Sequence, residues 1–333
     1  MRFATYNVEW FSNLFDDEGT ILDDNGWSGR HDVRRHDQLE ALAIVFTALD
    51  ADAIMIVEAP DSHRRRDGVA ALQNFARAAD LRARTAVMGF INETQQEIAF
   101  LFDPDRIDAL HDPKGTPRFD SEYRIDLDVD AEPERVRWSK PPLELAVTIR
   151  DKGSALRLIG VHAKSKAPHG ARSSEQAMRI AIENRRKQLA QCIWLRERVE
   201  DHLDVGDDLI VMGDFNDGPG LDEYERLFGK SGVEIVMGGE DDIQLFDAHA
   251  DALMARGVGG VMPASARFWM ADRKRYMQTL LDYVMVSPGL RDRASDWRIW
   301  HPFDDPACYE TPELRDALLT ASDHFPVSVE LDI

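Results

Sequence analysis

The stretch LIVMGDFNDGP, residues 209–219, joins a short apolar run to a polar turn whose residues could do chemistry. The apolar residues 209–212 predict a buried strand, and a glycine and a proline close the turn. Asp214 and Asn216 stand two residues apart, so along a continuing strand their side chains would point the same way. A carboxylate can bind a metal ion or a water, and a carboxamide can donate to a phosphoryl oxygen. The stretch therefore fits a cation or phosphate site or, taken alone, an ordinary turn that ends a strand.

Polar residues of similar type stand at or near the ends of other strand-like runs. They are Asn7, Glu58, His162, Asp282, Asp323 and His324. Each has an ordinary structural interpretation by itself, because strand ends meet solvent and a lone histidine is more often structural than catalytic. Asp282 is the hardest to explain in that way, since a carboxylate between Leu281 and Tyr283 needs a partner. Together these residues favour an active site over a series of coincidences.

Apolar runs predict the strands that deliver these residues, and three- and four-residue spacings predict helices between them. Strands are expected at 2–8, 53–57, 98–102, 143–149, 156–161, 209–212, 281–286 and 327–331. Helices are expected at 39–49, 69–81, 174–203 and 221–229, and loops or irregular segments at 15–35, 120–134 and 238–275. Strands mixed with helices over the whole length predict an α/β fold in a single domain, residues 1–333.

The composition is that of an acidic protein with an ordinary core. Of the 333 residues 44% are hydrophobic, and the formal net charge is −21. Such a charge repels polyphosphates at long range, which excludes tight non-specific nucleic-acid binding but not nucleic acid as a substrate. No apolar run approaches the ~20 residues of a membrane span, and Met1 leads into a strand-like run, so we expect neither membrane insertion nor a signal peptide. With only Cys192 and Cys308, we expect no disulfide framework and a cytoplasmic location.

Four basic clusters interrupt the acidic sequence. They are Arg34-Arg35, Arg64-Arg65-Arg66, Arg185-Arg186-Lys187 and Arg273-Lys274-Arg275. Each by itself is most simply a solvated face of a helix or loop. If the clusters at 34–35, 64–66 and 273–275 lay on the same rim as the strand ends, they could instead guide a polyanion.

Six pieces of the sequence resemble the endonuclease/exonuclease/phosphatase superfamily, which includes DNase I-like nucleases, abasic-site endonucleases, sphingomyelinases and inositol polyphosphate phosphatases. The pieces are TYNVEWF with Asn7, DADAIMIVEAP with Glu58, GVHAKSK with His162, VMGDFND with Asp214 and Asn216, LLDYVMVS with Asp282, and ASDHFPVSVEL with Asp323 and His324. They fall in the order of the family and span almost the whole chain. Two departures are Val57, where many members carry Gln, and Lys140, where related sequences often show Arg. The resemblance implies a four-layer α/β sandwich, with two mixed β-sheets packed face to face and helices outside.

The resemblance also implies a metal-dependent phosphoesterase and a role for each matching residue. Ligands of Mg²⁺ or Mn²⁺ would come from Asn7, Glu58, Asp214 and Asp323. The catalytic residues would be His162, Asp214, Asn216, Asp282 and His324. Asp214 would orient the attacking water, while His324, held by Asp282, would act as a base or bind the phosphate as an imidazolium. Contacts to the substrate phosphate would come from His162, Lys164 and Asn216, and His162 could instead protonate the leaving oxygen.

The substrate is left open by this set of residues, because the loops around a site select the substrate. The leading hypothesis is a nuclease that acts on DNA or RNA, supported by His162 and by the basic clusters. A second hypothesis is a phosphatase or phosphodiesterase for a small-molecule or lipid-headgroup phosphate, which the acidic surface favours. A third, a binding module without catalysis, is disfavoured because no catalytic position is missing. No obligate protein partner is evident.

Overall fold

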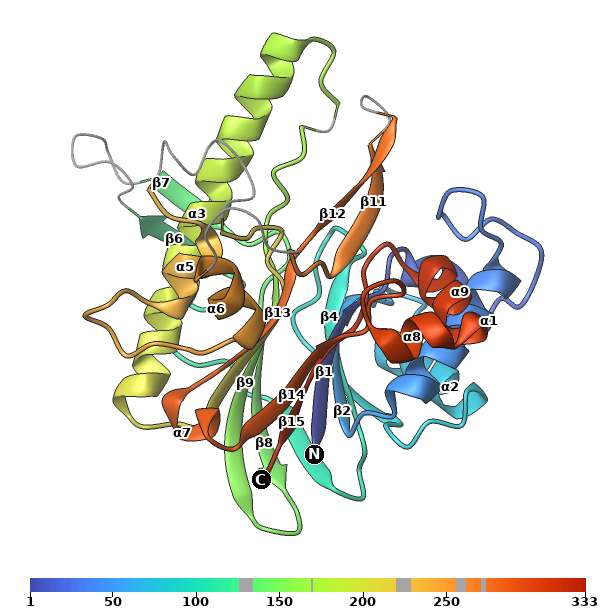
Figure 1. The fold of residues 1–333 in the computed structure, drawn as a ribbon, viewed down its shortest axis with the longest axis horizontal. Coiled ribbons are helices and arrows are strands. Elements are labelled where there is room, and N and C mark those ends of the chain that lie inside the picture. Colours follow the sequence, from blue (N-terminus) through green and yellow to red (C-terminus); the bar gives the residue numbers. More distant parts are fainter. Residues whose placement is uncertain (126–133, 169, 220–228, 256–261, 271–273) are drawn as a thin grey trace.

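Two mixed β-sheets packed face to face form the centre of the computed structural model, with helices on the outer faces (Figure 1). The structure describes residues 1–125, 134–168, 170–219, 229–255, 262–270 and 274–333. The six-stranded sheet has the order β14 (Ala294–Ile299), β15 (Val327–Leu331), β1 (Arg2–Asn7), β2 (Ala53–Ala59), β4 (Glu97–Phe102) and β3 (Thr85–Met88). The five-stranded sheet has the order β13 (Asp282–Val286), β10 (Leu209–Asp214), β9 (Ser154–His162), β8 (Leu143–Ile149) and β5 (Ile107–His111). This architecture is the predicted four-layer α/β sandwich.

Side chains that alternate along the strands divide the core into an inner layer and two outer layers. In β10, Ile210 and Met212 belong to the cluster between the sheets. Leu209 and Val211 belong to the cluster between the five-stranded sheet and its helices. A strand buried on both faces reads as a continuous apolar run, which is why the sequence identified β10 so clearly.

Helices cover the outer faces of the two sheets (Figure 1). On the six-stranded sheet lie α1 (Arg35–Leu49), α2 (Gly68–Ala78) and α9 (Pro312–Ala321), and on the five-stranded sheet α3 (Ser174–Asp204) and α5 (Gly232–Met237). The other helices of the described residues are η1 (Phe11–Leu14), α6 (Ala248–Met254), α7 (Pro288–Arg291) and α8 (Pro306–Glu310). In α3 the later residues, among them Trp194, Leu195 and Val199, pack on the sheet. The beginning of α3 extends beyond the ends of the strands (Figure 1).

Strand pairing brings the polar strand ends to one end of the sandwich. β1 and β2 run parallel, with Asn7 beside Val57. β9 and β10 also run parallel, with His162 beside Asp214. β13 runs antiparallel to β10 and begins with Asp282, directly beside Asp214. The carboxyl ends of β1, β2, β9 and β10 and the start of β13 therefore meet at one end of the sandwich.

The predicted strands are all present, with bounds within two residues of those expected. The predicted loop at 120–134 is wrong in part, because β6 (Glu122–Ile125) pairs with β7 (Glu134–Arg137) and their apolar residues Ile125 and Val136 join the core. The irregular segment expected at 238–275 is also wrong in part, because it contains α6, β11 (Ala266–Met270) and the first residue of β12 (Arg275–Thr279), which pairs with β11. Nearly all of the helix predicted at 221–229 lies outside the described residues.

Two further predictions concern the cysteines and the membrane. Cys192 and Cys308 are both buried and neither forms a disulfide, as predicted. Within the described ranges, no helix has the length and apolar character that crossing a bilayer demands.

Candidate active site

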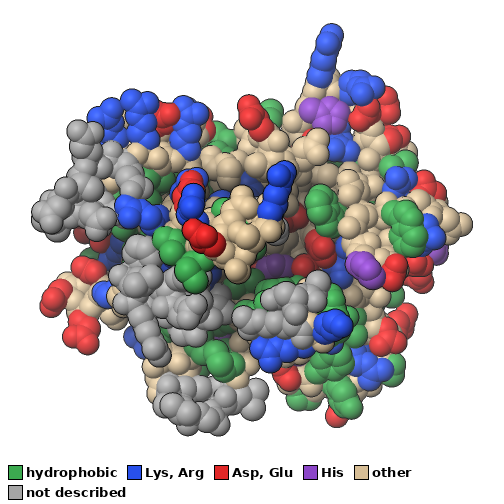
Figure 2. All heavy atoms as spheres, turned by 90° about the horizontal axis from the view of Figure 1, so that it is seen from above, with side chains coloured by type: hydrophobic (Ala, Val, Ile, Leu, Met, Phe, Trp, Pro, Cys, Tyr) green, Lys and Arg blue, Asp and Glu red, His purple; other side chains and the backbone are tan. Residues whose placement is uncertain are grey.

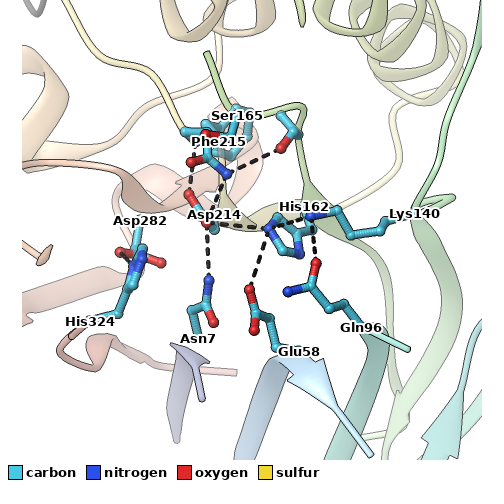
Figure 3. Close-up of polar contacts among 12 residues, drawn as sticks. Asn7, Glu58, Gln96, Lys140, His162, Ser165, Asp214, Phe215, Asp282 and His324 are labelled. Carbon is cyan, nitrogen blue, oxygen red and sulfur yellow. Dashed lines mark hydrogen bonds and ion pairs between the residues drawn. The ribbon is translucent and has the colours of Figure 1, made fainter. Parts of the chain in front are cut away.

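Asn7 and Glu58 approach the site from neighbouring strands of the six-stranded sheet (Figure 3). The pairing of β2 with β4 is interrupted between Val57 and Ala59, and Glu58 at this bulge has a φ of 60°. A left-handed backbone is unfavourable for a glutamate and is typically retained where it aims a functional side chain. Burial raises the pKa of Glu58, although the backbone N–H of Trp10 donates a hydrogen bond to the carboxylate. The bulge thus holds a carboxylate that the surroundings do not fully stabilise.

Asp214 ends β10 and lies among the other polar residues of the site (Figure 3). Gly213 before it has a φ of 139°, and any side chain there would collide with the carbonyl oxygen of Val161. Oδ1 of Asp214 accepts the backbone N–H of Asn216 at 2.8 Å. Oδ2 accepts Nδ2 of Asn7 and Nδ2 of Asn216, both at 3.0 Å. These bonds fix both oxygens of the carboxylate.

His324 and Asp282 form a buried pair near Asp214. Nδ1 of His324 lies 2.7 Å from Oδ2 of Asp282, which also accepts the hydroxyl of Ser265 at 2.7 Å. Burial by itself would lower the pKa of His324. The negative charges of Asp282, Asp214 and Asp323 have the larger effect and raise this pKa well above its ordinary value. Burial is also the main cause that raises the pKa of Asp214 to about 7. A charged imidazolium therefore lies beside a carboxyl group that titrates near neutral pH.

Three carboxyl groups, those of Glu9, Glu58 and Asp323, influence one another beside this pair. Burial and then Asp323 raise the pKa of Glu9 to about 7, and Glu58 contributes in the same direction. Arg30 forms an ion pair with Glu9 and opposes the shift. Oδ1 of Asn7 is buried without a hydrogen-bond partner. Crowded carboxylates and an unpaired amide oxygen are the hard ligands that divalent cations such as Mg²⁺ prefer, so this group fits such an ion.

A second group could also hold a metal ion by distance alone. Ligand atoms of Asp214, Asp282 and His324 lie within 4.8 Å of one another. His324 and Asp282 already share a short hydrogen bond, however, so a cation there would have to compete with the imidazole proton. These three residues therefore form a cluster of two carboxyl groups and an imidazole beside the crowded acids, and the whole acidic region is suited to a divalent metal.

His162 and Lys140 lie together on another side of Asp214 (Figure 3). Nε2 of His162 is 2.8 Å from Nζ of Lys140 and 3.6 Å from Oδ2 of Asp214. Burial, then Lys140 and His324, lower the pKa of His162 well below its ordinary value, so the neutral ring accepts from the ammonium. Lys140 also donates to Oε1 of Gln96 at 3.0 Å, and burial lowers its pKa to about 8. The positive charge on this side belongs to Lys140, which the sequence marked only as a departure from the family pattern.

Asn216 and Lys164, both predicted to bind phosphate, are placed differently. Asn216 has a φ of 51°, and its Nδ2 donates to Asp214 and to the carbonyl oxygen of Ala163 at 3.1 Å. A phosphoryl oxygen would have to replace one of these bonds, so Asn216 is built first to hold Asp214. Lys164 lines the cavity above the site, and Oε1 of Gln191 accepts its backbone N–H at 2.9 Å.

Behind these residues a positioning network ties α3 to the loops after β9 and β10. The network consists of Lys166, Arg185, Gln188 and Asp217. Nε2 of Gln188 lies 2.9 to 3.1 Å from the backbone carbonyl oxygens of Lys164, Phe215 and Asn216. Nη1 of Arg185 donates to Oε1 of Gln188 at 2.8 Å and forms a buried ion pair with Asp217, which Nζ of Lys166 approaches to 2.6 Å. The sequence prediction missed this network, although an arginine and a glutamine three residues apart on a core helix are a detectable signal.

A cavity of about 1240 Å³ opens onto the site. Its polar base, the cavity floor, is formed by Asn7, Glu9, Glu58, His162, Asp214, Asn216, Asp323 and His324. The floor thus brings together every predicted site residue except Asp282, which lies directly behind His324, and Lys164, which stands on the wall. Glu9 is the member that the sequence prediction missed.

The basic clusters of the sequence are placed mostly away from this cavity. The guanidinium of Arg34 lies 3.3 Å from the centre of the Trp27 ring, and Arg185 belongs to the positioning network. Among the described residues of the four clusters, Lys187 lines the cavity and the others do not. Any guidance of a polyanion by the clusters at 34–35 and 64–66 would thus come from outside the cavity lining and stays a prediction, and Arg273 lies outside the described residues.

Acids grouped for a divalent cation beside a buried carboxylate and a histidine–aspartate pair, at one end of such a sandwich, define a hydrolase of phosphoester bonds, of nuclease or phosphatase type. The chain belongs to the Endonuclease/Exonuclease/phosphatase family, whose model matches residues 4–324. The family resemblance of the six sequence pieces is thereby confirmed.

Solved structures with the same fold come from bacteria and animals. The 3'-5' exonuclease NExo from Neisseria meningitidis is 17% identical, with 100% of each chain covered and a TM-score of 0.53. Truncated TDP2 from Caenorhabditis elegans is 14% identical, with 98% of this chain and 96% of that chain covered and a TM-score of 0.53. No curated protein sequence matches this chain. At these identities the likeness to the solved structures shows a common fold.

Proposed function

We propose that this protein is a Mg²⁺- or Mn²⁺-dependent nuclease that hydrolyses phosphodiester bonds of DNA or RNA, with residues 1–333 acting as one catalytic domain. The charge pattern of the cavity carries the proposal. Outside the cavity floor, the charged side chains that line the described part of the cavity are all basic, namely Arg137, Lys140, Lys164, Lys166 and Lys187. This pattern occurs in a chain with 61 acidic and only 40 basic residues, so it favours a substrate with several phosphates. Two unbridged cysteines support the cytoplasm as its compartment.

The acids of the floor would hold the metal ion. We assign Asn7, Glu58 and Asp323 as ligands, with Glu9 and Asp214 next to them, because their crowding and the unpaired oxygen of Asn7 call for a cation. When bound, such an ion polarises a phosphoryl oxygen and lowers the pKa of a coordinated water. The remaining chemistry comes from side chains of this chain.

Asp214 and His324 would act on the attacking water and on the phosphate. A carboxylate whose pKa is about 7 is well matched to removing a proton from water near neutral pH, and Asn7 and Asn216 hold it in place. The imidazolium of His324, fixed by Asp282, would bind a non-bridging phosphoryl oxygen through a charge-assisted hydrogen bond. Water then attacks phosphorus in line with the bond to the leaving oxygen.

Lys140 would donate a proton to the leaving oxygen. Its ammonium is held by His162 and Gln96 and retains a third N–H for substrate. A pKa of about 8 keeps it charged at neutral pH and makes it a competent proton donor to the departing oxygen. His162 then acts mainly by holding Lys140, because its own low pKa leaves it without a proton to give from Nε2.

A metal-dependent substrate panel tests the proposal. The panel contains plasmid, single-stranded DNA, RNA, bis-p-nitrophenyl phosphate and an inositol phosphate, each with Mg²⁺, Mn²⁺ or a chelator. We expect cleavage of nucleic acid and of the reporter diester with metal and none with the chelator. Raising the salt from 50 to 200 mM should weaken nucleic-acid binding steeply and leave reporter hydrolysis almost unchanged, since several phosphates are contacted only in the first case.

The second candidate, a phosphatase for a small-molecule or lipid-headgroup phosphate, has one observation in its favour. The cavity walls carry Met178, Phe268, Met270 and Met277, which could cover an apolar substituent. Hydrolysis of the inositol phosphate without cleavage of any nucleic acid would replace the first proposal by this one. If no member of the panel is hydrolysed, with or without metal, the remaining hypothesis is a binding module of the same fold.

A further inference from the structure

The walls of the cavity are apolar to an extent that a metal ion and a phosphate do not explain. One wall is the beginning of α3, which contributes Ala177 and Met178, and Met178 is 56% exposed. Another is the ribbon β11–β12, which contributes Phe268, Met270 and Met277. Both α3 and the ribbon rise beyond the same end of the sandwich (Figure 1). A substrate that fills this cavity must therefore carry flat or flexible apolar groups next to its phosphate.

The ribbon separates a face that lines the cavity from a face that does not. Phe268 pairs with Met277 across the two strands, and both side chains line the cavity. The next pair, Trp269 and Tyr276, lies on the opposite face, where the ring centres are 5.1 Å apart. Adjacent aromatic residues of one short strand thus lie on opposite sides of the ribbon, and of the two Phe268 lines the cavity.

A pair of lysines stands on the cavity wall beyond the floor. Lys164 and Lys187 both line the cavity, and after burial it is the charge of Lys187 that lowers the pKa of Lys164. Lys187 also pairs with Glu183 at 2.7 Å, but both side chains are more than half exposed, so a substrate anion can compete for the ammonium. Two neighbouring cations on a cavity wall are suited to an anion between them.

We propose that the cavity binds a single strand of nucleic acid, with the scissile phosphate at the floor, a neighbouring phosphate between Lys164 and Lys187, and an unstacked base against Phe268 and Met277. This inference rests on the proposed nuclease function and narrows its substrate. A single strand offers both a row of phosphates and free faces of its bases, and bases stack on aromatic side chains in sequence-tolerant sites. Lys164, predicted from the sequence to bind phosphate, thereby gains a defined partner.

A continuous duplex fits the same surface less well. Its bases are stacked inside, so it would present only sugars and phosphates to Phe268, Met270 and Met277. Figure 2 looks onto this end of the molecule and shows basic, acidic and hydrophobic side chains intermixed over the described residues rather than a broad basic face. A duplex gripped by its backbone needs such a face. The charges that favour nucleic acid here are concentrated inside the cavity.

Matched variants of the full-length protein test the proposal. Phe268→Ala should lower kcat/KM for a single-stranded oligonucleotide about tenfold, the scale of one lost base–aromatic contact. Its loss on bis-p-nitrophenyl phosphate, which has no base, should be several-fold smaller, while Trp269→Ala, on the other face of the ribbon, should leave both activities unchanged. Lys187→Ala should raise KM for the oligonucleotide and reduce its salt dependence, whereas Arg179→Ala, a basic residue of α3 outside the cavity lining, should do neither.

The outcomes separate this inference from the nuclease proposal. Wild-type cleavage of a single strand at least tenfold faster than of the same sequence as a blunt duplex supports the inference. Equal cleavage of both, with Phe268→Ala no worse than Trp269→Ala, overturns it and leaves the nuclease in place. Hydrolysis of the reporter diester and of a short-chain phospholipid, but of no oligonucleotide, overturns both and assigns the apolar walls to an acyl chain.

Discussion

The cavity floor and the positioning network are neighbouring buried polar regions with opposite character. In the network, Arg185 and Asp217 neutralise each other, and the two N–H groups of the Gln188 carboxamide are shared among three carbonyl oxygens. Nε of Arg185 is buried without a hydrogen-bond partner. In the floor, Glu9 and Asp214 have a pKa of about 7. Glu58 has a left-handed backbone, and Oδ1 of Asn7 and Nδ1 of His162 are buried without partners. Polar groups are paired where the chain must be rigid and left unpaired where a ligand is to bind.

The largest effect on activity is expected when a residue of the cavity floor is replaced. Asp214→Asn and His324→Ala should each lower turnover of bis-p-nitrophenyl phosphate by ~100-fold or more, the scale of a positioned acid–base group. Asp214→Asn should leave the free energy of unfolding unchanged or raise it, because it removes a buried carboxylate whose raised pKa opposes folding at neutral pH. Turnover and urea unfolding of the same purified variants measure both effects. Near-wild-type turnover in either variant would contradict the catalytic assignment. Strong destabilisation of Asp214→Asn would contradict the difference in stability effects between the cavity floor and the positioning network.

Replacing a charged residue of the positioning network should instead lower the free energy of unfolding. Asp217→Ala leaves Arg185 buried without its counter-charge, which typically costs about 3 kcal/mol or more. Urea unfolding should show this loss, whereas Asp201→Ala, an exposed acid of α3, should change the free energy of unfolding by less than about 0.5 kcal/mol. A loss below about 1 kcal/mol in Asp217→Ala would mean that the network is not the rigid element described above.

A bound metal ion should offset the repulsion among the acids of the cavity floor and so stabilise the protein. It should not affect the positioning network. At a Mg²⁺ concentration of about 100 times the dissociation constant, the wild type should gain roughly 2.7 kcal/mol of stability, seen as a higher Tm that a chelator reverses. Glu58→Gln should lose most of this gain. Glu97→Gln is the matched control, because Glu97 is also buried with a pKa raised to about 7 by burial but does not line the cavity. An equal Tm response in both variants would contradict the ligand assignment.

The smallest expected effect concerns pH. Burial lowers the pKa of Lys140 to about 8, so the ammonium loses its proton, and kcat/KM should fall, as the pH rises through that value. Lys140→Arg keeps its charge at any such pH and should move the alkaline limb upward by more than one pH unit, with about tenfold lower activity because the guanidinium fits the site less well. Lys164→Arg should leave the limb in place. An unmoved limb in Lys140→Arg would assign it to another group.

The sequence predicted the central strands and most of the floor because both carry strong local signals. Strands buried on both faces read as apolar runs. Asp214 follows such a run, Asp282 interrupts one, and His324 comes shortly before one. The sequence prediction missed the ribbon β11–β12 because its strands form a separate two-stranded sheet and are largely half-exposed or exposed, so their alternation contrasts little with that of a loop.

Individual site residues escaped for other reasons. Glu9 lies two residues beyond the end of β1, where an acid is indistinguishable from a surface residue. Gln188 and Arg185 are polar residues of a helix, and only the packing of α3 on the loops shows that they are fully buried. The role of Lys140 depends on its contact with His162 at the end of β9. Lys140 itself lies in the segment between β7 and β8, and the sequence alone does not show that this segment reaches His162.

The pairing of β1 with β15 has a consequence for the order in which activity appears. These strands lie side by side at the centre of the six-stranded sheet, with Thr5 opposite Val327. A nascent chain on the ribosome that has not yet reached residue 323 holds Asn7 and Glu58 but lacks Asp323 and His324 of the floor. It also lacks the strand that completes the middle of the sheet. We therefore expect no hydrolysis of phosphoester bonds by a nascent chain until β15 has been translated and has docked onto β1.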